Sequence, residues 1–319
     1  MIKNYTFDSP LAQQMDHYVS LKQMQGYDFI TGARRLKRFD SFLSEKGCHD
    51  GVLHMDDMQN YCNEMNDLRV QTQAGHHSCV RQFSLYMHAI NPASSVFPCS
   101  TLSRHPQNIR CFPLSKEQIT CLMQACTIVF GQSAIRADCF RFLIGLLYCT
   151  GLRIGEALAL NLGDVDTQQA TLLVRRGKFK KERLIALSSS AFAALKQWIR
   201  KRSAYSDSDE HTAPLLVVDW NRRLSYQQAE RGFRKLCQHE DLVGSPAPRL
   251  HDLRHNFACH TIEYWRETKQ DVNALLPVLA NVMGHVDYFS TQTYIHTTAE
   301  SLRQATDKLS IYRNHKKDY

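Results

Sequence analysis

The sequence predicts a mainly α-helical protein with one small antiparallel β-sheet, divided into a helical first domain and a mixed α/β second domain. The 319 residues exceed the usual size of one domain, and the 43% of hydrophobic residues is enough to fill two cores. Apolar side chains recur at helical spacing along most of the chain. Two β-branched or apolar runs, at residues 171–175 and 183–187, have instead the length and separation of a hairpin.

Four helices are predicted in the first domain. Apolar residues at helical spacing begin at Leu11, and Gly26 marks the end of this short helix. In the next helix an apolar face lies opposite several arginines, and Gly47 ends it. The four predicted helices cover residues 11–26, 30–46, 56–65 and 78–90. Together they favour a compact all-helical domain.

A linker is expected after these helices. Residues 91–113 contain several prolines and serines and have no sustained hydrophobic period. We therefore place the linker from about residue 91 and the domain boundary near residue 105. The predicted domains are residues 1–105 and residues 106–319.

The second domain is predicted to begin with two helices. Ser115, with Gln118 three residues later, resembles a capping box for a helix that runs to about residue 130. The apolar segment 136–149 predicts a buried helix that ends in a turn at Gly151, which presents Arg153. After the hairpin, further helices are expected at residues 189–201, 225–238, 251–267, 272–283 and 298–311.

The charge of the chain favours an anionic partner. The formal net charge is +8 and the isoelectric point is near 8.9. Residues 1–105 hold ten basic and ten acidic residues, so the whole excess lies in the second domain. There, residues 175–183 hold six cations and one anion, which is more than a solvated turn requires.

The first domain has its own cluster of basic residues. Arg34, Arg35, Lys37 and Arg38 lie within five positions of one predicted helix. They form either a stripe that faces phosphates or an ordinary solvated helix face, and the sequence leaves both open.

Cysteine usage and the absence of long apolar runs indicate a soluble intracellular protein. The 11 cysteines are scattered and include no C-x-x-C pair, so reduced and mostly buried thiols are expected. The first ten residues have no apolar signal-peptide core, and no run of 18 apolar residues occurs. We expect a bacterial-type cytoplasmic protein.

Several short motifs point to chemistry on a phosphodiester. Thr-Gly-Leu-Arg ends at Arg153, His-Asp-Leu-Arg-His spans residues 251–255, and a Gly-His pair at residues 284–285 lies before Tyr294. A guanidinium stays charged and can bind two phosphate oxygens at once, so Arg153 and Arg254 are suited to hold one phosphate. Loss of one such preorganised donor typically costs about 3 to 4 kcal/mol of transition-state stabilisation.

Tyr294 is the candidate nucleophile for this phosphate. A phenol has a pKa of about 10, so attack at neutral pH needs a base or cationic neighbours. His251 and His285 are placed to help. Each residue alone has an ordinary structural explanation, such as a surface arginine or a packed tyrosine. The residues together, in this order, predict cleavage of a DNA strand without a metal ion.

A zinc site is the alternative for the histidines. His251 and His255 are four residues apart on one predicted helix, a spacing that can bind zinc. The metalloprotease motif places Glu after the first histidine, whereas this chain has Asp252, and Arg254 would repel a cation. We therefore expect no metal and no cofactor, with His255 and His260 structural or close to the phosphate.

These motifs resemble those of the tyrosine recombinases, the phage-integrase-like site-specific recombinases. The resemblance covers roughly residues 110–312 and includes the Gly-Lys and Lys-Glu-Arg pattern of the hairpin. It implies a helical core-binding domain followed by the family's mixed α/β catalytic domain. The first domain is similar in size, helicity and position only. Residues 276–279 resemble the members carried by transposons and other mobile elements.

The resemblance implies a role for each motif residue. Arg153 and Arg254 would bind the scissile phosphate, and His251 would act as base or proton shuttle. His285 would donate a hydrogen bond to a non-bridging oxygen, and Tyr294 would attack. The product would be a 3′-phosphotyrosyl bond and a free 5′-hydroxyl, so that rejoining needs no ATP.

The resemblance also implies a general acid and two supporting carboxylates. A hairpin lysine would protonate the leaving 5′ oxygen, and alignment of the Gly-Lys pair assigns this role to Lys178. Lys180 and Lys181 are close rivals. Glu156 and Asp252 would hold the arginine and the histidine in place, or would simply cap helices.

The implied partner is double-stranded DNA with specific recombination sites. Four subunits would assemble on two sites, and the free protein would be a monomer or weak oligomer. The predicted helix 298–311 has an apolar stripe that would dock on a neighbouring subunit or on its own domain. Arg34, Arg35, Arg38, and also Arg81 and Gln82, are candidates for groove or phosphate contact.

Two other functions use the same residues. A type IB topoisomerase would share the phosphotyrosine chemistry and relax supercoils as a monomer. A regulator that has lost catalysis would bind DNA and form no adduct. The sequence does not choose between integration, excision, resolution and inversion.

Overall fold

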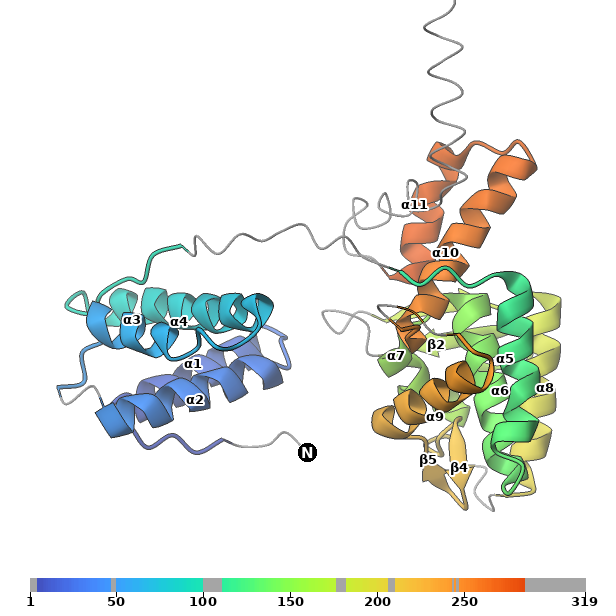
Figure 1. The fold of residues 1–319 in the computed structure, drawn as a ribbon, viewed down its shortest axis with the longest axis horizontal. Coiled ribbons are helices and arrows are strands. Elements are labelled where there is room, and N and C mark those ends of the chain that lie inside the picture. Colours follow the sequence, from blue (N-terminus) through green and yellow to red (C-terminus); the bar gives the residue numbers. More distant parts are fainter. Residues whose placement is uncertain are drawn as a thin grey trace, which may run out of the picture. The chain divides into compact units, whose positions relative to one another are not determined.

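The chain forms two compact units, residues 1–109 and residues 110–319 (Figure 1). The computed structural model describes residues 5–46, 50–99, 111–175, 182–205, 210–242, 244 and 247–284. Within these residues it is mainly helical with two small antiparallel sheets, which confirms the predicted fold class.

The described residues of the first unit form four helices packed around one core (Figure 1). They are α1 (Ala12–Met24), α2 (Ile30–Lys46), α3 (Met55–Asn63) and α4 (Val70–Ile90). Leu36, Phe39 and Leu43 of α2 are buried, whereas Arg34 and Arg38 are exposed. The apolar spacing therefore predicts α2 correctly from its first residue to its last.

Helix α4 begins eight residues earlier than predicted. Gly75, His76 and His77 have low helix propensity, so the sequence suggested a start at residue 78. Tertiary contacts explain the longer helix, because the buried Tyr61 hydroxyl hydrogen-bonds His76 Nδ1 at 2.7 Å. Glycine at position 75 also leaves space for the Arg35 side chain of α2, since a Cβ there would lie 2.4 Å from Arg35 Nη2.

The segment predicted to start the linker packs on the first unit instead. Phe97 is buried, and its backbone N–H donates to Ser84 Oγ at 2.9 Å. The N–H of Ser95 donates to the carbonyl of Leu53 at 2.8 Å. Residues 91–99 therefore belong to the helical unit, because these contacts outweigh the loop-like composition.

The second unit is built around helix α6 (Ala134–Thr150), which is buried along most of its length. Its neighbours include α5 (Lys116–Val129), α8 (Ser189–Ser203) and α10 (Leu250–Glu267) (Figure 1). The predicted capping box of α5 is present, because Gln118 N donates to Ser115 Oγ at 3.2 Å and Ser115 N to Gln118 Oε1 at 2.9 Å.

Three further α-helices lie in the described part of this unit. Helices α9 (Tyr226–His239) and α11 (Val272–Met283) lie where they were predicted, and α11 packs against α10. The sequence did not predict α7 (Ile154–Ala159), which has only six residues. The predicted helix 298–311 lies outside the described residues.

The predicted hairpin is confirmed. Strands β2 (Thr171–Val174) and β3 (Arg183–Ala186) are antiparallel, with Val174 opposite Arg183. A short β1 (Val165–Asp166) pairs with the other edge of β2. The second sheet, β4 (Val217–Asp219) with β5 (Arg222–Arg223), was not predicted because its strands are too short to show a period.

Two composition-based expectations can be compared with the described residues. No disulfide is recorded among the ten cysteines in this part of the chain, and four of them are buried, fewer than the mostly buried thiols that were expected. Burial raises the pKa of Cys126 and Cys237 to about 12, so both are protonated near neutral pH. No helix in the described ranges is long and apolar enough to cross a membrane.

Candidate active site

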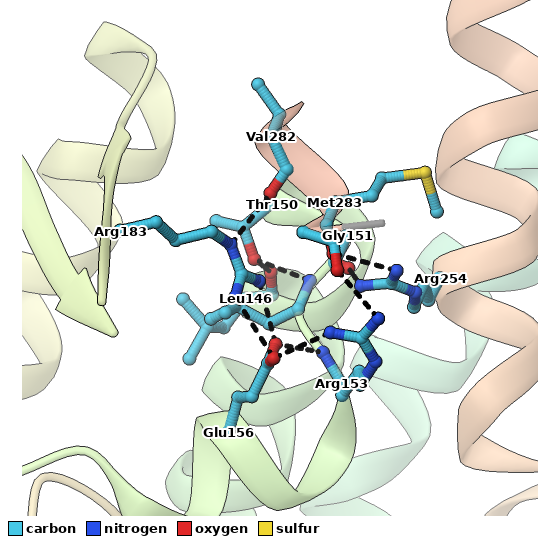
Figure 2. Close-up of polar contacts among 11 residues, drawn as sticks. Leu146, Thr150, Gly151, Arg153, Glu156, Arg183, Arg254, Val282 and Met283 are labelled. Atoms are coloured by element: carbon cyan, nitrogen blue, oxygen red, sulfur yellow. Dashed lines mark hydrogen bonds and ion pairs between the residues drawn. The ribbon is translucent and has the colours of Figure 1, made fainter. Parts of the chain in front are cut away.

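Arg153 is presented by a tight turn between two helices. Helix α6 ends at Gly151, whose φ of +62° lies in the left-handed region. A Cβ at this position would also lie 2.4 Å from Phe257 Cδ1, so the turn requires glycine. Arg153 then becomes the N-cap of α7 and projects toward Glu156 (Figure 2).

Glu156 binds two arginines from different elements. Its Oε1 accepts from Arg153 Nη1 at 2.8 Å and from Arg183 Nη1 at 3.0 Å. Its Oε2 accepts from the Arg153 backbone N–H at 3.0 Å and from Arg183 Nη2 at 2.8 Å (Figure 2). Burial alone would raise the pKa of Glu156, but the hydrogen bonds and charges of these arginines lower it below its usual value.

Three arginines converge on the carboxyl end of helix α11. Arg183 Nε donates to the Val282 carbonyl at 3.2 Å, Arg254 Nη2 to the Met283 carbonyl at 2.8 Å, and Arg153 Nη2 to the Gly284 carbonyl at 2.9 Å. These are three consecutive carbonyls at the negative end of a helix, where cations are stabilising. Arg254 also donates to the Gly151 carbonyl, which joins α10 to the α6–α7 turn (Figure 2).

Glycine is needed where α11 ends. Gly284 has a φ of +66°, and a Cβ there would lie 2.7 Å from Arg183 Cζ. At its other end, α11 begins at Asp271, whose carboxylate accepts from the backbone N–H groups of Asn273 and Ala274. The helix therefore has a fixed start and a fixed end, directly before His285.

His251 lies in the first turn of α10, three residues before Arg254. Desolvation by neighbouring side chains lowers the pKa of His251, and the positive charges of Arg254, Arg249 and Arg153 act in the same direction. The imidazole is therefore neutral near neutral pH and able to accept a proton.

His255 packs against His251. The two rings meet edge to face, with centroids 4.6 Å apart and an interplanar angle of 89°. His255 is buried, and burial together with the charge of His251 lowers its pKa to about 4. Of the two histidines, His251 is the exposed one. His260 is half-buried, and its Nδ1 hydrogen-bonds the Tyr148 hydroxyl at 2.8 Å.

Asp252 caps helix α10, and its charge opposes the lowering of the His251 pKa. Its Oδ2 accepts from the Arg249 backbone N–H at 2.8 Å, and its Oδ1 accepts from Arg249 Nη2 at 2.9 Å. The expected contact with His251 is not among its hydrogen bonds to described residues, and the capping explanation is the one that the geometry supports. Sequence reasoning missed Arg249, which has no motif of its own.

Several candidates lie outside the described residues. These are Lys178 with its rivals Lys180 and Lys181, and also His285 and Tyr294. What the structure describes is the strand pair on either side of the lysines and the helix end before His285.

The basic cluster of α2 does not form one stripe. Arg34 and Arg38 are exposed and one turn apart. Arg35 is half-buried against Gly75, and Lys37 is ion-paired with Asp8 and with the buried Asp40. Lys37 therefore stabilises the first unit through these ion pairs. Of the three arginines in this cluster, Arg34 and Arg38 have exposed side chains.

The candidate Arg81 on α4 is also engaged within its unit. It is half-buried, and its Nε donates to Cys99 Sγ at 3.2 Å, whereas the neighbouring Gln82 is exposed. Sequence reasoning missed a second basic helix face, on α9, where Arg231, Arg234 and Lys235 are exposed beside the buried Phe233 and Leu236. The strong amphipathic period of α9 was the available signal.

The site defines a class of protein: a mainly helical enzyme in which the motif arginines Arg153 and Arg254 bind one helix end. Comparison with known proteins agrees with this class. The model of the phage integrase family matches residues 113–301. The chain therefore belongs to the phage integrase family, and it is a tyrosine site-specific recombinase.

Two relatives illustrate the match. A putative integrase/recombinase, y4rB of Sinorhizobium fredii, is 30% identical over 312 residues, which cover 94% of this chain and 97% of the relative. The tyrosine recombinase XerC of Alcanivorax borkumensis is 30% identical over 228 residues, which cover 72% of this chain and 68% of the relative. These relatives do not favour the topoisomerase or the inactive regulator.

Solved structures share the fold. XerH recombinase bound to a palindromic difH substrate matches with a TM-score of 0.66 and 18% identity, over 92% of this chain and 83% of that one. The Tn1549 transposon integrase in complex with a circular intermediate DNA matches with a TM-score of 0.64 and 17% identity, over 93% and 98%.

Proposed function

We propose that Arg153 and Arg254 bind the scissile phosphate of a DNA duplex and that Tyr294 attacks it. One observation carries this assignment: the two arginines, from helices far apart in the sequence, donate to the successive carbonyls of Gly284 and Met283. Their guanidinium groups are thereby held next to each other. Preorganised cations of this kind stabilise the charge that develops on a phosphate during attack.

The proposed reaction is a transesterification. The Tyr294 hydroxyl oxygen bonds to phosphorus and gives its proton to His251, whose lowered pKa keeps it ready to accept one. The bond from phosphorus to the 5′ oxygen breaks, and Lys178 gives that oxygen a proton. The intermediate is a 3′-phosphotyrosyl bond beside a free 5′-hydroxyl. Attack by the 5′-hydroxyl of a second strand reverses these steps, so neither ATP nor a metal ion takes part.

The remaining roles are those that the resemblance to the family implies. His285, which in the sequence directly follows the helix end that binds Arg153, is assigned to a non-bridging phosphate oxygen. Lys180 and Lys181 stand on the same connection as Lys178 and are its rivals as general acid. Glu156 contributes by fixing Arg153, with which it shares two hydrogen bonds.

The proposed partner is double-stranded DNA that carries specific recombination sites. Recombinases of this fold are known bound to difH and to a circular transposon intermediate. Exposed basic side chains on α2 and α9 would contact phosphates of this duplex. We further propose a homotetramer on two synapsed sites, a role in a mobile element, and action at the nucleoid in a bacterial cytoplasm.

A covalent adduct is the direct test. Purified protein is incubated with a nicked duplex made from the DNA that flanks its own gene, and denaturing gels are used to detect protein linked to DNA. We expect an adduct that disappears in Tyr294→Phe. Failure of the wild type to form it on any flanking fragment, with binding intact, would favour the inactive regulator.

A second comparison separates recombination from relaxation. Removal of residues 300–319 should reduce strand exchange between two duplexes more than cleavage of a single site, since the tail is proposed to join subunits. Equal loss of both activities would argue against a tail exchanged between subunits. Supercoil relaxation by the monomer without exchange would instead indicate a topoisomerase.

A further inference from the structure

We propose that Arg183, at the start of strand β3, is a positioning residue for DNA cleavage. It does not bind the phosphate itself. It fixes Glu156 and the end of helix α11, and through them it fixes Arg153. This inference rests on the proposed function of Arg153, and the experiment below separates the two.

The guanidinium group of Arg183 donates hydrogen bonds through all three of its nitrogens. Nη1 and Nη2 bind the two carboxylate oxygens of Glu156 at 3.0 and 2.8 Å, and Nε donates to the Val282 carbonyl at 3.2 Å (Figure 2). All three nitrogens are thus used for one side chain and one helix end. This is the fork geometry that arginine provides and that lysine cannot reproduce.

Burial makes this arrangement strong. The side chain of Arg183 is 13% exposed and that of Glu156 is 4% exposed, whereas that of Arg153 is 28% exposed. Water therefore screens the Arg183–Glu156 pair very little. Of the two arginines on Glu156, Arg153 is therefore the more exposed one.

The contacts of Arg183 continue to Arg153 by two routes. In the first route Glu156 binds the backbone N–H and Nη1 of Arg153. In the second route Val282 and Gly284 belong to the same helix end, and Gly284 binds Arg153 Nη2. Arg183 therefore closes a ring of contacts, and removal of its fork frees both supports of Arg153 at once.

Arg183 also ties the hairpin to this ring. It is the first residue of β3 and lies opposite Val174, so it stands at the base of the connection that carries Lys178. Arg183, at the base of this hairpin, and Arg153, the proposed phosphate-binding arginine, both bind the carboxylate of Glu156. A displacement of about 1 Å at a reacting group can lower a rate by about 100-fold, so this link is expected to affect cleavage.

The test compares Arg183→Lys with a matched control. In Arg141, Nε likewise donates to a backbone carbonyl, that of Met123 at 3.1 Å, and Nη1 binds the carboxylate of Asp138 at 3.4 Å, but Arg141 lies outside the site. The probe is the nicked flanking duplex on which the wild type forms its adduct. Binding constants, single-turnover adduct rates and melting temperatures are measured for Arg183→Lys, Arg141→Lys, Glu156→Gln and the double variant Arg183→Lys/Glu156→Gln.

We expect Arg183→Lys to lower the adduct rate by about 10- to 100-fold while the binding constant changes by less than about two-fold. Its melting temperature should fall by more than that of Arg141→Lys, because the Arg183–Glu156 pair is the more buried one, but the variant should stay folded at the assay temperature. The adduct rate of Arg141→Lys should equal that of the wild type. The double variant should be no slower than the slower single variant, because both changes break one chain of contacts. Added methylguanidinium should partly restore the adduct rate of Arg183→Ala.

Each other outcome has a definite meaning. An unchanged adduct rate in Arg183→Lys overturns the positioning role. So does a rate loss that only reflects unfolding of the variant at the assay temperature, or a double variant whose losses multiply. If binding weakens in parallel with cleavage, Arg183 is a DNA ligand and the inference is wrong. A wild type that forms no adduct contradicts the proposed function instead.

Discussion

Arg153 Nη2 donates a hydrogen bond to the Gly284 carbonyl at 2.9 Å, which joins the N-cap of α7 to the C-cap of α11. The same guanidinium binds Glu156 through Nη1. The proposed phosphate-binding group is therefore held by backbone and carboxylate together. Its position depends on how helix α11 ends, and this dependence can be tested at Gly284.

Gly284→Ala should weaken both the fold and the site. The φ of +66° is unfavourable for alanine by about 1 to 2 kcal/mol, and the new Cβ would lie 2.7 Å from Arg183 Cζ. Because the clash involves the fork of Arg183, we expect a loss of unfolding free energy together with slower adduct formation. Denaturant titration and single-turnover cleavage measure the two effects.

Gly155→Ala is the matched control for stability. Gly155 lies inside helix α7, has no positive φ, and nothing lies within 4 Å of an added Cβ. Alanine there should be neutral or should stabilise by up to about 1 kcal/mol. Equal effects of alanine at the two positions would contradict the role assigned to Gly284.

The sequence predicts those parts of the structure that depend on local patterns. Helix α11 was predicted from its first residue to its last, because Asp271 caps its start and Gly284 ends it. Helix α7 was missed, since six residues that include a glycine show no helical period. The start of α4 was missed because the His76–Tyr61 contact is tertiary.

The sequence indicated which residue types could form a site but not their contacts. The motif order singled out Arg153, His251 and Arg254 as candidates, and the structure brings Arg153 and Arg254 to one helix end. No local pattern indicated that Arg183 would bind Glu156, because this pair depends on where β3 lies against α7. For Asp252 the sequence left open whether it would hold the histidine or cap a helix, and the contacts of Asp252 with Arg249 show the cap of α10.

Glu156→Gln should destabilise the protein at neutral pH and less so in acid. The change removes a buried charge that binds two arginines, which is expected to cost about 2 to 3 kcal/mol at pH 7. The pKa of Glu156 is lowered in the folded state, so its contribution is present above the ordinary value of 4.5 and is lost as the pH falls through the folded-state pKa. Urea titrations at a series of pH values should show the two proteins converging below about pH 4.5. A constant difference across this range would mean that the charge of Glu156 is not the cause.

His255 should make the wild type lose stability in mild acid. Burial and the charge of His251 lower its pKa from 6.5 to about 4 in the folded state. A lowered pKa means that the unfolded chain binds the proton first, so stability is complete above pH 6.5 and falls as the pH approaches 4. The difference is up to about 3 kcal/mol. His255→Gln should lose less stability than the wild type over this interval, whereas the exposed His17→Gln serves as the control. Parallel curves for the wild type and His255→Gln would show that His255 does not cause the loss.

Arg34→Ala and Arg38→Ala should weaken DNA binding in a salt-dependent way. Both side chains are exposed and one turn apart on α2, so each is placed to neutralise a phosphate. Each change should make the slope of log binding constant against log salt concentration shallower by roughly 0.9, as measured by fluorescence anisotropy on the flanking duplex. Lys37→Gln is the control, because Lys37 already neutralises Asp8 and Asp40 and should leave the slope unchanged. If Lys37→Gln lowers the slope as much as Arg34→Ala does, the basic residues of α2 act as one stripe after all. If neither arginine changes it, this face of α2 points away from DNA.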